Sequence, residues 1–73
     1  MVIMKKDITL QLASNLRKFR QARKLTQQKL ADSVGIEYKY IQRLESKKPP
    51  AVRLDTLARL AKALQVHPAR LLS

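Results

Sequence analysis

Residues 25–44 read LTQQKLADSVGIEYKYIQRL, and this stretch decides the fold. Thr26 can cap a helix over about Gln27 to Ser33, because its hydroxyl can accept a hydrogen bond from a free N–H of the first turn. Gly35 is the only glycine of the chain and follows that helix, at a position that often needs a positive φ. A second helix is predicted over about Glu37 to Ser46, so the stretch predicts two short helices joined by a tight turn.

The apolar residues of this stretch have the spacing of two helices that cross closely. Ala31 lies where the helices would touch, so its side chain must be small, and Ile41 would fill the angle between them. The other inward positions are also apolar: Leu30, Val34, Ile36 and Leu44. Helices with these contacts form a helix-turn-helix unit, here over about residues 26–46.

Three further helical segments are predicted around this unit. They cover about residues 8–23, about residues 54–64, and a short segment that begins near Pro68. Asp7 or Thr9 is the predicted cap of the first, and Pro49-Pro50 prevents the second helix of the unit from continuing. The predicted fold class is therefore all-α, a compact five-helix domain, with residues 1–73 forming one domain.

The net charge of the chain limits the classes of molecule that it is expected to bind. The 73 residues include 16 Lys and Arg against 5 Asp and Glu, for a formal net charge of +11. This imbalance favours a polyanion, either nucleic acid or an anionic membrane surface. The membrane is the weaker alternative, because the apolar faces of the predicted helices fit one another as a globule and no apolar run is long enough to span a bilayer.

The residue types argue against catalysis. The chain has no cysteine and a single histidine, His67, and it lacks a Gly-rich phosphate loop and a cluster of carboxylates. His67 stands just before Pro68 and is interpreted as a helix-start residue. We therefore expect no enzyme activity, no metal site and no cofactor. The lack of cysteine fits a reducing cytoplasm.

Residues 25–36, followed by Tyr40-Ile41-Gln42-Arg43-Leu44-Glu45, resemble the phage-repressor and Cro-type family of DNA-binding domains, also called the xenobiotic-response-element family. Residues 54–64 resemble the fourth helix of that family, so the resemblance covers about residues 10–72 and implies a repressor-like fold. Family members usually have glycine where this chain has Lys47 and Gln65. We expect a left-handed turn at both positions, at some cost for a side chain other than glycine.

The resemblance implies that the helix over about residues 37–46 enters the major groove of double-stranded DNA. Four of its outward side chains are the predicted base contacts: Tyr38, Lys39, Gln42 and Arg43. Arginine and lysine donate to guanine, and glutamine pairs with adenine, although Gln42 could equally reach a phosphate. Tyr38 can pack on a thymine methyl group or donate its hydroxyl.

The resemblance also assigns residues that grip the DNA backbone. Gln27, at a helix N-terminus, is predicted to bind a phosphate and to brace the next helix. The other predicted phosphate contacts are Tyr40, Lys47, Lys48 and Arg53. Arg20 and Glu45 occupy the positions of an ion pair that family members form. Three further basic residues could either contact phosphates or simply form the solvated face of the first helix: Arg17, Arg23 and Lys24.

These features predict a sequence-specific DNA-binding transcriptional regulator, acting as a repressor in a bacterial cytoplasm, chromosomal or phage-encoded. A homodimer is expected, because one such helix covers only a few base pairs. Its predicted surface is C-terminal, with Val66, Leu71 and Leu72, although these leucines could equally be core. The alternative function is an antitoxin-type module that binds a toxin as well as its own operator.

Overall fold

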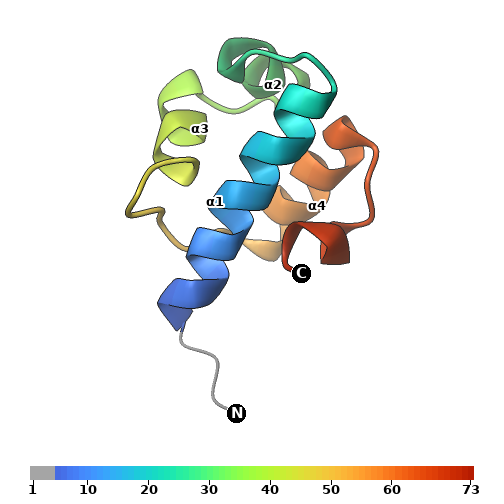
Figure 1. The fold of residues 1–73 in the computed structure, drawn as a ribbon. Coiled ribbons are helices and arrows are strands. Elements are labelled where there is room, and N and C mark those ends of the chain that lie inside the picture. Colours follow the sequence, from blue (N-terminus) through green and yellow to red (C-terminus); the bar gives the residue numbers. More distant parts are fainter. Residues whose placement is uncertain (1–4) are drawn as a thin grey trace.

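The structure is a computed structural model that describes residues 5–73, with side chains from residue 8 on. Its elements are α1 (Lys5–Ala22), α2 (Gln27–Val34), α3 (Tyr38–Leu44), α4 (Leu54–Leu64) and a 3-10 helix, η1 (Pro68–Leu71) (Figure 1). The described residues contain no strand, which confirms the all-α class. The prediction of five α-helices is wrong at the last one. The N–H of Arg70 bonds the carbonyl of His67 at 2.8 Å, and this three-residue step makes η1 a tighter helix than an α-helix.

The first helix begins earlier than the sequence analysis predicted. α1 already includes Lys5, so Asp7 and Thr9 lie inside it and the prediction that one of them caps it is wrong. No proline or glycine separates Lys5 from Ile8, so nothing in the sequence stops the helix there. α3 is shorter than predicted, because Glu37 and Glu45 are its two caps and not members of it.

The helices enclose one apolar core. In Figure 1, α1 crosses the centre of the view, with α2 above it, α3 on the left and α4 on the right. The inward positions predicted for the helix-turn-helix are confirmed: Leu30, Ala31, Ile41 and Leu44 are 0% exposed, Val34 is 5% exposed, and Ile36 packs on the cluster from a half-buried position. The other buried members of the cluster are Leu12, Leu16, Leu57, Leu60, Ala61, Leu64 and Leu71. Leu71 is therefore core, which decides between the two roles that the sequence analysis left open for it.

The turn between α2 and α3 depends on Gly35. Its φ is 79°, in the left-handed region, and its N–H bonds the carbonyl of Ala31 at 2.8 Å. A Cβ built at this position would lie 3.2 Å from Nη2 of Arg59, whose guanidinium donates a hydrogen bond to the carbonyl of Val34. Glycine thus supplies both the backbone conformation and the space in which an α4 arginine caps the end of α2.

The other left-handed residues were only partly foreseen. Gln65 has a φ of 58° at the end of α4, as predicted, but Lys24 has a φ of 57° and was missed. Lys47 is not in this region, so that prediction is wrong. The hydroxyl of Ser46 donates to the carbonyl of Arg43 at 2.7 Å and accepts from the N–H of Lys48 at 3.3 Å. These side-chain bonds reverse the chain after α3 without a positive φ.

Candidate nucleic-acid interface

Helix α3 has a buried side and an exposed side of opposite chemistry. Ile41 and Leu44 anchor it with no exposed surface. The predicted base-contact residues are all exposed: Tyr38, Lys39, Gln42 and Arg43. The helix therefore presents four hydrogen-bonding side chains outward from a support that is fixed by core packing.

Two of these side chains are bonded to each other. The Nε2 of Gln42 donates to the hydroxyl oxygen of Tyr38 at 2.9 Å, one helical turn apart. The phenolic hydrogen of Tyr38, the second amide hydrogen of Gln42 and the carbonyl oxygen of Gln42 remain available, so the pair offers both donors and an acceptor. Lys39 and Arg43 are also one turn apart and add only donors. This mixture matches the acceptors of guanine and the donor and acceptor of adenine in the major groove.

The C-terminal end of α3 is fixed by a buried carboxylate. The side chain of Glu45 is only 1% exposed. Arg20 of α1 grips it with two hydrogen bonds, Nε to Oε2 at 2.7 Å and Nη2 to Oε1 at 2.9 Å. These bonds raise the pKa of Arg20 above its usual value. Here the structure has the ion pair that the sequence analysis expected, and it ties α1 to α3.

The first residue of α2 joins the same cluster. Thr26 accepts a hydrogen bond from the N–H of Lys29 at 3.0 Å and so caps α2. Next to it, the Nε2 of Gln27 donates to Oε1 of Glu45 at 3.1 Å. Gln27 is half-buried, and this bond braces α3 as the resemblance implied. The residue predicted to bind a phosphate therefore lies where α2 begins and α3 ends.

The remaining predicted phosphate contacts differ in how exposed their side chains are. Lys47 and Lys48 are exposed in the segment that follows α3. Arg53 is exposed too, with its Nε 3.2 Å from Oδ1 of Asp55. Tyr40 is half-buried and packs against the core, apart from the exposed cations. Lys47 and Lys48 thus lie together after the end of α3, and the phosphate contact of Tyr40 stays a prediction.

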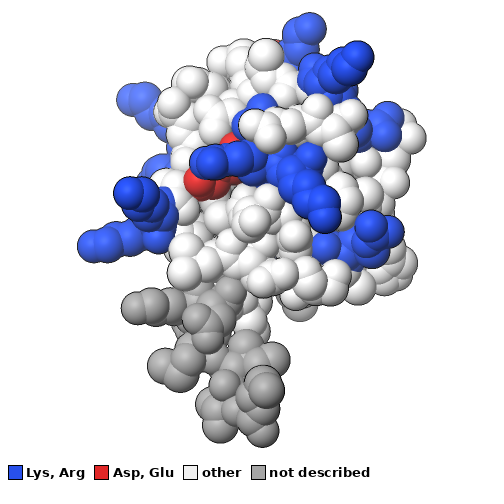
Figure 2. Space-filling view, viewed as in Figure 1, with Lys and Arg blue, Asp and Glu red and all other residues white. Residues whose placement is uncertain are grey.

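Basic side chains are scattered over the face that Figure 2 draws. The acidic atoms near the centre of this face lie against basic ones.

Among residues 8–73, no three His, Cys, Asp or Glu side chains are grouped so that they could hold a metal ion. None of the described helices is long and apolar enough to cross a membrane.

Two arginines have contacts that sequence reasoning missed. Arg17 donates from Nη2 to the carbonyl of Glu45 at 2.9 Å, and its Nε lies 3.6 Å from Oε1 of that residue. Arg59 caps the end of α2. Arg17 lies one helical turn before Arg20 on the same face of α1, and that spacing was the available signal. Nothing in the sequence pointed to Arg59, because its partner is a backbone carbonyl of a distant helix.

Comparison with known proteins agrees with this geometry. Residues 16–71 match the helix-turn-helix family model. The chain is similar to the restriction-modification controller protein C.AhdI from Aeromonas hydrophila, with 30% identity and a TM-score of 0.80 over 86% of this chain and 94% of that one. It is similar to the hypothetical transcription factor NHTF from Neisseria, with 29% identity and a TM-score of 0.87 over 100% of this chain and 83% of that one.

A third similar structure is the clp gene regulator ClgR from Corynebacterium glutamicum, with 28% identity and a TM-score of 0.82 over 89% of this chain and 68% of that one. Comparison with curated proteins finds no significant match. The family match covers most of the chain, so the chain belongs to the helix-turn-helix family, of the Cro/C1 type. It is a DNA-binding transcriptional regulator, and the antitoxin alternative gains no support from these comparisons.

Proposed function

We propose that residues 1–73 act as one DNA-binding domain that reads a specific duplex sequence with α3 in the major groove and represses transcription. Tyr38, Lys39, Gln42 and Arg43 read base edges, while phosphates are held by Gln27, Tyr40, Lys47, Lys48 and Arg53. The protein acts on DNA in a bacterial cytoplasm, from a chromosomal or a phage-borne gene, and has no catalytic role.

One observation carries this proposal: the outward face of α3 consists of exposed hydrogen-bonding side chains, while the C-terminal end of the helix is fixed by Glu45. A rigid support matters because a base-reading side chain must be held in register with the base pair to discriminate. Each good base contact is expected to contribute ~1–3 kcal/mol of discrimination.

The test is selection of bound duplexes from a random pool, followed by a salt titration of the selected site. We expect one enriched sequence with two-fold symmetry. Three phosphate-binding cations in each protomer of a dimer predict a log–log slope of association against salt on the order of −5, at about −0.9 for each neutralised phosphate. Enrichment of no sequence, with equal binding to a simple polyanion such as heparin, would refute sequence-specific binding.

A homodimer is the second part of the proposal, and an uncharged hollow supports it. The apolar side chains of Ile8, Leu54 and Leu72 are 43%, 80% and 41% exposed. All three line a hollow of about 210 Å³ whose other lining residues, including Ala51 and Val52, carry no charge. Two chains of charge +11 repel each other, so they approach most easily through a charge-free apolar surface. Of the predicted dimer residues only Leu72 lies here, since Leu71 is core and Val66 packs against the core.

The dimer surface can be tested with Leu54→Glu, which places a charge in the hollow at a highly exposed position. We expect a dimer in the parent chain and a folded monomer in the variant by sedimentation equilibrium, with a melting temperature that no longer depends on protein concentration. Leu10→Glu is the matched control, because Leu10 is 39% exposed on α1 but lies outside this hollow. A variant that remained dimeric would show that the two chains meet elsewhere.

A further inference from the structure

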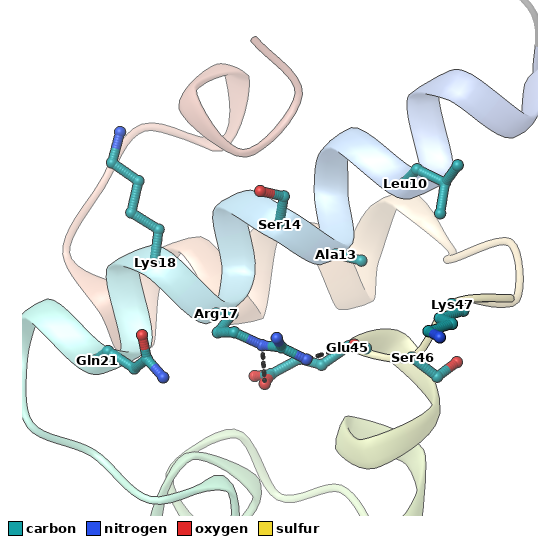
Figure 3. A pocket seen from close by; sticks show the side chains of 9 residues that line it. All are labelled: Leu10, Ala13, Ser14, Arg17, Lys18, Gln21, Glu45, Ser46 and Lys47. Atoms are coloured by element: carbon teal, nitrogen blue, oxygen red, sulfur yellow. Dashed lines mark hydrogen bonds and ion pairs between the residues drawn. The ribbon is translucent and has the colours of Figure 1, made fainter.

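A basic groove lies beside the C-terminal end of α3. It is bounded by Ala13, Ser14 and Arg17 of α1 on one side and by Glu45, Ser46 and Lys47 on the other (Figure 3). Its volume of about 430 Å³ is large enough for a phosphate with its adjoining sugars, since a liquid water occupies only ~30 Å³. The groove therefore has room for a segment of nucleic-acid backbone.

The charge that this groove offers is positive, although Glu45 lies at its base. The carboxylate of Glu45 is 1% exposed and already receives two hydrogen bonds from Arg20 and one from Gln27. It is thus neutralised from below and shielded from anything that enters the groove. The Nε of Arg17 lies 3.6 Å from the same carboxylate, but Arg17, Arg20 and Lys47 together outnumber its single negative charge, so the groove keeps a net positive charge. Lys18, which also lines the groove, points away from Arg17 and Glu45 in Figure 3.

Arg17 is placed to bind a ligand. Its hydrogen bond to the carbonyl of Glu45 orients the guanidinium across the groove. The side chain is nevertheless 55% exposed, and a guanidinium has five N–H donors, so most of them remain available. An arginine that is already oriented loses less freedom when it binds a phosphate than a free one does.

We infer that this groove holds a phosphate of the DNA backbone, with Arg17 and Lys47 as its ligands. This inference rests on the proposed function. The phosphate is assigned to DNA because the groove adjoins the base-reading helix: Ser46 and Lys47 directly follow Glu45, the C-cap of α3. Backbone that flanks the major groove entered by α3 passes this end of the helix. The groove adds Arg17 to the contacts that set affinity and leaves sequence choice to the exposed face of α3.

The test measures the salt dependence of binding to the selected duplex. Arg17→Gln is expected to reduce the magnitude of the log–log slope by about 0.9 for each bound protomer. It should weaken binding to all sequences by the same factor, so that base preference is unchanged. Arg17→Lys keeps the charge and should keep most of the slope. Lys62→Gln, which removes one exposed charge on α4, is the matched control and should leave the slope unchanged.

Lys47→Gln is the positive control, because Lys47 is already a phosphate contact of the proposed function and its side chain is exposed, so its loss should not disturb the fold. It is expected to lower the slope as Arg17→Gln does. If Arg17→Gln lowered the melting temperature but left the slope intact, Arg17 would serve only to hold α3 and the phosphate site would be refuted, with the proposed function standing. A parent chain that preferred no duplex would overturn both.

Discussion

Replacing Glu45 with alanine is expected to lower the stability of the folded chain by ~3–5 kcal/mol, because it leaves the buried Arg20 without its partner. The side chain of Arg20 is only 11% exposed, and Gln27 loses its acceptor in the same change. For a domain of this size, such a loss corresponds to a fall in melting temperature of about 12 °C or more, at ~4–8 °C per kcal/mol. Thermal unfolding followed by circular dichroism measures it directly.

Asp55→Ala is the matched control for that experiment. Asp55 also pairs with an arginine, at 3.2 Å from Nε of Arg53, but both side chains are largely exposed, at 62% and 84%. An exposed pair of this kind contributes ~0–1 kcal/mol, so this variant should melt within a few degrees of the parent. Equal melting temperatures for Glu45→Ala and the parent would remove the structural role assigned to the Glu45 cluster. We expect the base preference of any folded Glu45→Ala protein to be that of the parent.

Reversing both charges on the exposed face of α3, as Lys39→Glu with Arg43→Glu, should abolish specific DNA binding. Each replacement removes a hydrogen-bond donor to a base, which costs ~1–3 kcal/mol of binding free energy. Each new carboxylate is also repelled by the phosphates of the DNA backbone. The combined expectation is a loss of affinity of at least about a thousandfold, since ~1.4 kcal/mol corresponds to tenfold. Both residues are exposed, so the melting temperature should stay close to that of the parent.

Lys62→Glu with Arg70→Glu changes the net charge by the same amount and serves as the control. Both residues are exposed, on α4 and η1, away from the base-reading face. We expect this variant to bind only a few-fold more weakly, because the field of distant surface charges is screened within ~10 Å at moderate salt. Comparable losses in the two double variants would mean that α3 contributes charge but no base contacts.

Local sequence patterns predicted most of the fold. The apolar positions at helical spacing identified the helix-turn-helix core, and the lone glycine marked the turn, because Gly35 adopts a φ that other residues adopt at a cost. The errors lie at the ends of the helices. The start of α1 and the ends of α3 depend on caps and on contacts across the fold, which local patterns do not contain.

The candidate interface, too, was predicted in part from the sequence and decided in part by contacts across the fold. Spacing on α3 was enough to choose the outward residues Tyr38, Lys39, Gln42 and Arg43, because the buried Ile41 and Leu44 leave only one face to solvent. The bond between Gln42 and Tyr38 could have been inferred from their separation of one turn. The ion-pair contact of Arg17 with Glu45 had a signal in its spacing from Arg20. The bonds from Arg17 and Arg59 to backbone carbonyls had none, since each carbonyl belongs to a segment far along the chain.

The sequence by itself determined the helical class, the turn at Gly35 and which face of α3 is polar, because periodicity and backbone preference act over a few neighbouring residues. Only the tertiary structure decided that α1, α2 and α3 meet at Glu45, that Leu71 is core, and that Arg17 stands over a groove. Those features depend on how segments far apart in the chain pack together, and the direction of a side chain across such a contact is set by the whole core.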